Sequence, residues 1–91
     1  MIVRIATEGQ YRLDDGERPE LDRVDDTIVA ALDAGDQEGF HQRFTELLER
    51  VRAGAPLDAD ELVPSDLILP PPELTLEEAA KGFSDEGLIP D

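Results

Sequence analysis

The sequence predicts a small α+β fold, with residues 1–91 forming a single domain. Three patterns indicate this: alternating apolar residues at the start, two stretches with apolar residues at helical spacing, and a later segment rich in proline. They predict an N-terminal β-hairpin (1–13), an antiparallel αα-hairpin (19–54), a proline-rich extended strap (55–74) and a short C-terminal helix with a tail (75–91). A chain of this length buries about 60–65% of its unfolded surface, so we expect one small core.

The predicted β-hairpin depends on alternation. Val3 and Ile5 share one face of the first strand, and their β-branched side chains favour extended structure. Glu8-Gly9 predicts the turn, and the alternation then continues to Leu13. Because two strands alone are marginally stable in water, we expect later segments to cover their apolar face.

Two helices are predicted next. Pro19 suits the first turn of a helix, Gly35 ends this helix, and Asp36 caps the following one. The apolar positions of the first helix are Leu21, Val24, Ile28 and Leu32. Those of the second are Phe40, Phe44, Leu47, Leu48 and Val51. Since the link between the helices is short, they should pack antiparallel.

The strap, residues 55–74, holds five prolines between positions 56 and 72, which favour extended backbone. Its apolar content predicts ordered packing along the domain, with a short strand at 66–69. Thr75 and Glu78 have the spacing of a capping box, which predicts a short helix that runs to about Lys81. In the tail, Leu88 and Ile89 are expected to fold back on the domain.

Charge restricts the classes of partner. The chain has 23 acidic and 8 basic residues, a formal charge of −15, and no cysteine. This charge repels phosphate backbones and anionic lipid, so we expect no nucleic-acid binding and no direct membrane insertion. Seven of the eight basic residues are arginine, a balance that predicts a halophilic source, with an ordinary acidic protein as the alternative. No basic-then-apolar leader opens the chain, which predicts a cytoplasmic location.

Candidate catalytic residues do not form a recognisable set. His41 is the single histidine, and neither Ser65 nor Ser84 follows a strand-turn-helix pattern. Residues 58–61 begin like a calcium-binding loop, but Val63 stands where that loop needs glycine. The sequence therefore predicts a non-enzymatic protein with no cofactor and no metal site.

The first helix provides the candidate partner-binding residues. Four aspartates are expected on its outward side, away from the apolar positions: Asp22, Asp25, Asp26 and Asp33. They form a candidate docking face for a basic helical protein. The alternative is that they only solvate the helix.

Four segments of the chain resemble one known family. They are MIVRIATEGQYRLDD (1–15), DDTIVAALDAGDQEGF (25–40), ELVPSDLILPPPELTLEEA (61–79) and SDEGLIPD (84–91). Together they are similar to the PspA-associated protein family, PspAA. The resemblance implies an accessory of the phage-shock-protein system, whose main component PspA is a helical membrane-remodelling protein related to ESCRT-III.

The resemblance and the charge together predict an adaptor that binds a PspA-like helical protein and modulates the envelope stress response. Such a protein would reach the inner face of the membrane through its partner. A second hypothesis is a small acidic cation- or ligand-sensing regulatory domain, in which clustered carboxylates bind an ion and shift a conformational equilibrium.

Stability should rise with salt concentration, because added ions screen the repulsion among 23 carboxylates. The measurement is the melting temperature in potassium chloride from roughly 0.1 to 2 M, over which the Debye length falls from about 10 Å to below about 3 Å. A melting temperature that stays flat or falls over this range would contradict the expectation.

Overall fold

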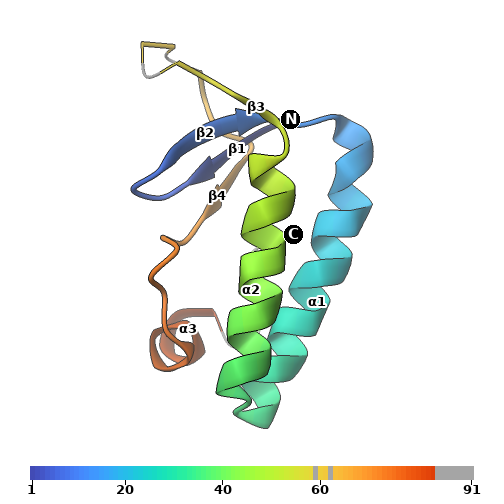
Figure 1. The fold of residues 1–91 in the computed structure, drawn as a ribbon, viewed down its shortest axis with the longest axis vertical. Helices are drawn as coiled ribbons and strands as arrows, with labels where there is room; N and C mark the ends of the chain where they lie inside the picture. The colour runs from blue at the N-terminus through green and yellow to red at the C-terminus, as the bar shows by residue number, and fades with distance from the viewer. Residues whose placement is uncertain (59, 62, 84–91) are drawn as a thin grey trace.

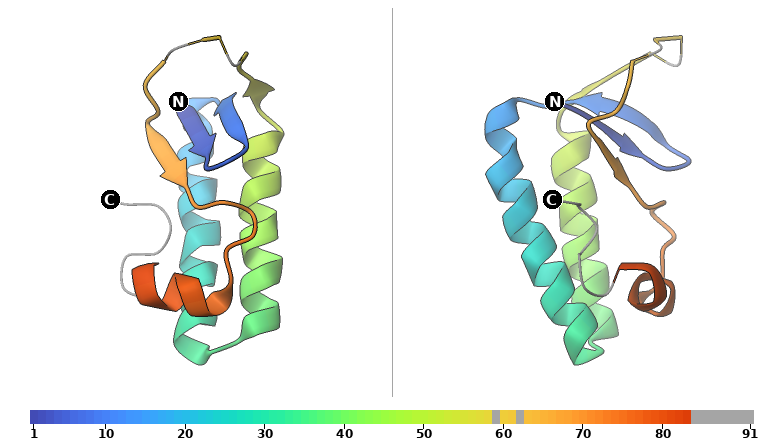
Figure 2. Two further views of the ribbon diagram at one scale, coloured as in Figure 1. Left: turned by 90° about the vertical axis from the view of Figure 1, so that its left-hand side faces the viewer. Right: turned by 180° about the vertical axis from the view of Figure 1, so that it is seen from behind.

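The computed structural model describes residues 1–58, 60–61 and 63–83. Its strands are β1 (Ile2–Ile5), β2 (Gly9–Arg12), β3 (Ala55–Pro56) and β4 (Leu67–Leu69). Its helices are α1 (Arg18–Ala34), α2 (Gln37–Arg52) and α3 (Leu76–Phe83), with a 3-10 turn at Asp15–Glu17. The α1–α2 hairpin forms one layer (Figure 1). Figure 2 shows that the sheet covers one end of this layer and α3 the other. This arrangement confirms the predicted α+β fold.

The β1–β2 hairpin forms as expected, but its turn lies earlier than predicted. Gly9 already pairs with Ile5 in the ladder, so residues 6–8 make the turn and not Glu8-Gly9. The N–H of Glu8 donates to the carbonyl of Ile5 at 3.0 Å. Thr7 has a φ of 69°, in the left-handed region that β-branched residues rarely adopt. The prediction was wrong because glycine, and not threonine, usually takes this conformation.

β3 and β4 both come from the strap and form the two edges of the sheet, which has the order β3-β2-β1-β4. β3 pairs antiparallel with β2, and β4 pairs parallel with β1, where Arg4 lies opposite Ile68. The strand predicted at 66–69 is therefore confirmed as Leu67–Leu69. A parallel pair needs a long connection between its strands, and here the chain from β1 to β4 includes both long helices.

Polar side chains fasten the strap to the sheet. The buried side-chain amide of Gln10 donates to the Val63 carbonyl at 2.9 Å and to Ser65 Oγ at 2.8 Å. The Asp66 carboxylate accepts a hydrogen bond from the Ile2 N–H at 2.7 Å. These bonds satisfy polar groups that would otherwise be costly to bury.

The two long helices begin and end where the sequence predicts, to within about two residues. Pro19 lies in the first turn of α1, and Gly35 ends this helix with a φ of 66°, in the left-handed region. The Asp36 carboxylate caps α2 by accepting the Gly39 N–H at 3.0 Å. α1 and α2 therefore fold back on each other across a two-residue link.

The capping box of the third helix is also present. The Thr75 N–H donates to Glu78 Oε1 at 3.1 Å, and the Glu78 N–H donates to Thr75 Oγ1 at 3.2 Å. α3 continues to Phe83, two residues beyond the expected end at Lys81. The predicted folding back of Leu88 and Ile89 lies outside the described residues.

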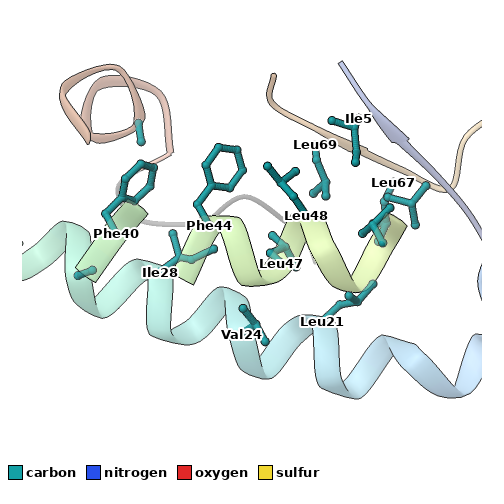
Figure 3. Packing of buried hydrophobic residues seen from close by; sticks show 14 of the residues in the cluster. Ile5, Leu21, Val24, Ile28, Phe40, Phe44, Leu47, Leu48, Leu67 and Leu69 are labelled. Atoms are coloured by element: carbon teal, nitrogen blue, oxygen red, sulfur yellow. The ribbon is translucent and has the colours of Figure 1, made fainter. Parts of the chain in front are cut away.

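The core lies between the two layers (Figure 3). The sheet contributes Val3, Ile5, Leu67 and Leu69, and Leu13 follows β2 directly. Phe40 and Phe44 on α2 stack, with ring centroids 5.6 Å apart. Figure 3 shows both rings on the side of α2 that faces α3, whose Ala79 is fully buried. The sheet and α3 thus cover two halves of one helical hairpin.

Phe44→Ala should lower the free energy of unfolding by about 3–5 kcal/mol, because Phe44 is only 2% exposed and its removal leaves a cavity. His41→Ala serves as the control on the same helix. His41 is exposed, so its loss should cost about 0.5 kcal/mol or less. Equal effects of the two substitutions in chemical denaturation would contradict the assigned packing of α2.

Candidate partner-binding surface

Three exposed aspartates line the outward side of α1. We call Asp22, Asp26 and Asp33 the α1 acidic stripe. A helix turns by about 100° per residue, so Asp26 and Asp33 lie within about 40° of Asp22 around the axis. The apolar residues of α1 point the other way, into the core. The stripe therefore places three carboxylates along one side of α1, with Val29 between Asp26 and Asp33.

The prediction that Asp25 shares this outward side is wrong. Asp25 is 5% exposed and is buried with the apolar residues of α1. It follows Leu21 by four residues and precedes Leu32 by seven, so helical spacing places all three on one side. The helical spacing of Asp25 indicates the buried side, whereas its charge favours the solvent side. Because its carboxylate is buried, Asp25 is removed from the candidate surface.

A network of ion pairs links α1 to α2 beside the acidic stripe. Glu20 Oε2 lies 3.1 Å from Arg23 Nη2 and 3.5 Å from Arg50 Nη2. On α2, Glu46 Oε1 lies 3.2 Å from Arg43 Nη1, and Glu46 Oε2 lies 3.7 Å from Arg50 Nε. The hydrogen bond from Arg23 lowers the pKa of Glu20 and raises the pKa of Arg23 itself. This side of α1 is therefore close to charge balance.

The acidic stripe itself remains largely unbalanced. Asp22 Oδ1 lies 3.1 Å from Arg18 Nε, an i,i+4 pair on the exposed surface. Within the part of the chain that the structure describes, Asp26 and Asp33 have no ion-pair partner.

A separate group of polar side chains ties the β1–β2 turn to the end of α2. Arg52 Nε donates to Glu8 Oε2 at 2.8 Å, and the Tyr11 hydroxyl donates to the same oxygen at 2.7 Å. These hydrogen bonds, with Arg52 the larger cause, lower the pKa of Glu8 from 4.5 to about 2. The hydrogen bond to Glu8 also raises the pKa of Tyr11. The group holds two elements together across 44 residues of chain.

The residues considered for catalysis are not brought together. His41 is exposed on α2, whereas Ser65 lies by the sheet and accepts a hydrogen bond from Gln10. Ser84 lies outside the described residues. Among the described residues, no group of three or more His, Asp or Glu side chains is arranged to hold a metal ion. In the same ranges, no helix has the length and apolarity needed to cross a bilayer.

The fold and the charge define the chain as a small acidic α+β domain. The family model of PspA-associated protein, PspAA, matches residues 1–91, and the chain belongs to this family. Its membership confirms the resemblance seen in the sequence and gives it an accessory role linked to PspA. Comparison with curated proteins gave no match, and neither did comparison with solved structures.

Glu8 should stabilise the fold at neutral pH and lose this effect in acid. Its pKa in the folded chain is about 2, below the usual 4.5, so its contribution is present above about pH 4.5 and is lost as the pH falls towards 2. Glu8→Gln should therefore lower the free energy of unfolding at pH 7 by about 1 kcal/mol or less, since Arg52 is partly exposed.

The measurement is the difference in unfolding free energy between the original chain and the variant from pH 7 to pH 2.5. Taking this difference cancels the pH dependence caused by the other carboxylates, which the two proteins share. Glu73→Gln is the control, because Glu73 is exposed and has no ion pair within the described ranges. A Glu8→Gln difference that stays constant with pH would show that the Glu8–Arg52 pair contributes nothing.

Proposed function

We propose that this PspAA protein is a non-enzymatic adaptor that binds PspA through the α1 acidic stripe and thereby modulates the envelope stress response. The observation that carries the proposal is the pair of uncompensated, exposed carboxylates, Asp26 and Asp33, on a helix otherwise held by ion pairs. Membership of the PspA-associated family supports PspA as the partner. The contact is expected on a basic surface of the PspA helices.

Electrostatics supports this mode of binding. At −15 the whole chain attracts a cationic surface during approach, while the stripe sets where close contact is made. Exposed ion pairs add little affinity individually, about 0–1 kcal/mol each, so the main effect of the stripe is on association rate and orientation. We therefore expect binding that is fast and depends on salt.

The same charge supports a regulatory effect. PspA acts at the membrane, and basic segments bind anionic lipid at about 1 kcal/mol per Lys or Arg. A bound acidic domain would cover such a basic surface and compete with the lipid. In this proposal the chain reaches the membrane only through PspA, because its own charge is repelled by anionic headgroups.

The test is a triple variant, Asp22→Asn, Asp26→Asn and Asp33→Asn, measured for binding to purified PspA from the same source. All three side chains are exposed, so the fold should be retained. The association rate should fall by about tenfold at low ionic strength, and the difference should shrink as salt is added.

The matched control removes three charges elsewhere, by Glu49→Gln, Glu61→Gln and Glu73→Gln, which are also exposed. The control has the same net charge as the stripe variant. Any difference in association rate between the two variants therefore comes from where the charges were removed. Equal association rates for the two variants at every salt concentration would exclude the α1 acidic stripe as the docking face. Absence of binding by the original chain would overturn the proposed function itself.

A further inference from the structure

The outer face of the sheet carries an exposed apolar residue beside an exposed arginine. Arg4 on β1 and Ile68 on β4 are paired in the ladder, so their side chains lie next to each other on one face. Their neighbours along the strands, Val3, Ile5 and Leu67, are buried on the other face against the helices. Ile68 is 62% exposed and is the one large apolar side chain exposed among the described residues.

Among the described residues, Arg4 is one of two arginines that have no ion-pair partner. Six basic side chains lie within 4.0 Å of a carboxylate: Arg18, Arg23, Arg43, Arg50, Arg52 and Lys81. In the described part of the chain, Arg4 and Arg12 have no such contact. Both lie on the sheet, in a domain with 23 acidic residues. The two arginines without an ion pair among the described residues therefore both lie on the sheet.

β4 also presents backbone groups at the edge of the sheet. It is the terminal strand, with only β1 beside it among the described residues. The Leu69 carbonyl accepts the Ala6 N–H at 3.0 Å, so Leu69 faces β1. Because backbone groups alternate along a strand, the N–H and C=O of Ile68 point away from β1. Pro70 follows and has no N–H, which limits this edge to a short added strand.

We propose that the β4 edge binds a short extended segment of a partner protein that carries a carboxylate next to an apolar side chain. The segment pairs with the backbone of Ile68 as an added strand. Its apolar side chain packs on Ile68, and its carboxylate meets the Arg4 guanidinium. This site is separate from the α1 acidic stripe and does not rest on the proposed function.

The spacing of strands is compatible with this contact. An added strand would lie about 10 Å from β1, two strand spacings away, and a glutamate and an arginine side chain together span that distance. Asp58 and Glu61 line a hollow with Arg4 on the side towards β2 and the strap. The carboxylate of the partner is therefore expected on the β4 side of Arg4, away from these two acids.

The net charge decides which acidic partner is suitable. Charges beyond about 8 Å are largely screened at physiological ionic strength, so one carboxylate at Arg4 responds mainly to its immediate surroundings. A polyanion such as a nucleic acid would extend over the acidic remainder of the domain and be repelled. The site therefore fits a single carboxylate in a mostly apolar segment.

The probe is a capped peptide in which isoleucine and glutamate alternate with threonine, compared with the same peptide carrying glutamine for glutamate. Alternation places the isoleucine and the glutamate on one face of an extended strand. Binding to the full-length chain is followed by amide chemical shifts. The largest changes are expected at Ile68, at the residues flanking it and at Arg4.

Arg4→Gln should weaken binding of the glutamate peptide by about threefold to fivefold and leave the glutamine peptide unaffected. Ile68→Thr keeps the preference for extended structure and should weaken both peptides. Arg43→Gln is the control, since it removes an exposed arginine on α2. Equal loss for both peptides in Arg4→Gln, or shift changes that map away from β4, would overturn the proposal.

Measurements on the chain without peptide distinguish two other possible occupants of the β4 edge. If shifts at Ile68 depend on protein concentration without peptide, a second copy occupies the edge and the proposal is wrong. If the Ile68 amide of the free chain is protected from hydrogen exchange and Leu88→Asp removes the protection, the C-terminal segment of the same chain occupies the edge. That result also overturns the proposal.

Discussion

The packing of the inner face of the sheet on the α1–α2 hairpin is the contact on which the rest of the structure depends. Neither the β1–β2 hairpin nor the two helices could bury enough apolar surface alone. Val3 and Ile5 from the first strand meet Leu47 and Leu48 from the second helix in one core. The side chains that this packing does not bury form the exposed surfaces of the domain. The positions of Asp26, Arg4 and Ile68 all follow from it.

Local patterns predicted the helices and strands of this fold well, but they could not predict which strands distant in the sequence pair with each other. The capping box at Thr75 and the helix end at Gly35 involve residues within a few positions, so the sequence contained the whole interaction. The place of β4 beside β1 depends on contacts such as that between Ile2 and Asp66, 64 residues apart. No local pattern encodes such a pair. The early turn at Thr7 was missed because its backbone conformation is unusual for threonine.

The candidate surface was predicted in part, and the failure has a different cause. Asp22, Asp26 and Asp33 are exposed as expected, while Asp25 is buried although its spacing from Leu21 and Leu32 was visible. The net charge of the sequence also does not reveal how the charged residues are distributed over the surface. The sequence has a large acidic excess, but only the structure shows that ion pairs between α1 and α2 balance one side of the helix. What remains exposed and unpaired is a smaller set than the composition suggests.

The two-layer fold separates two kinds of surface. The α1 acidic stripe faces away from the core on the helical layer, and Arg4 with Ile68 faces away from it on the sheet. Both surfaces are exposed because the opposite face of the same helix or strand packs into the core. A partner on one layer therefore leaves the other layer accessible. A domain with one small core can therefore present two separate surfaces, one on the helices and one on the sheet.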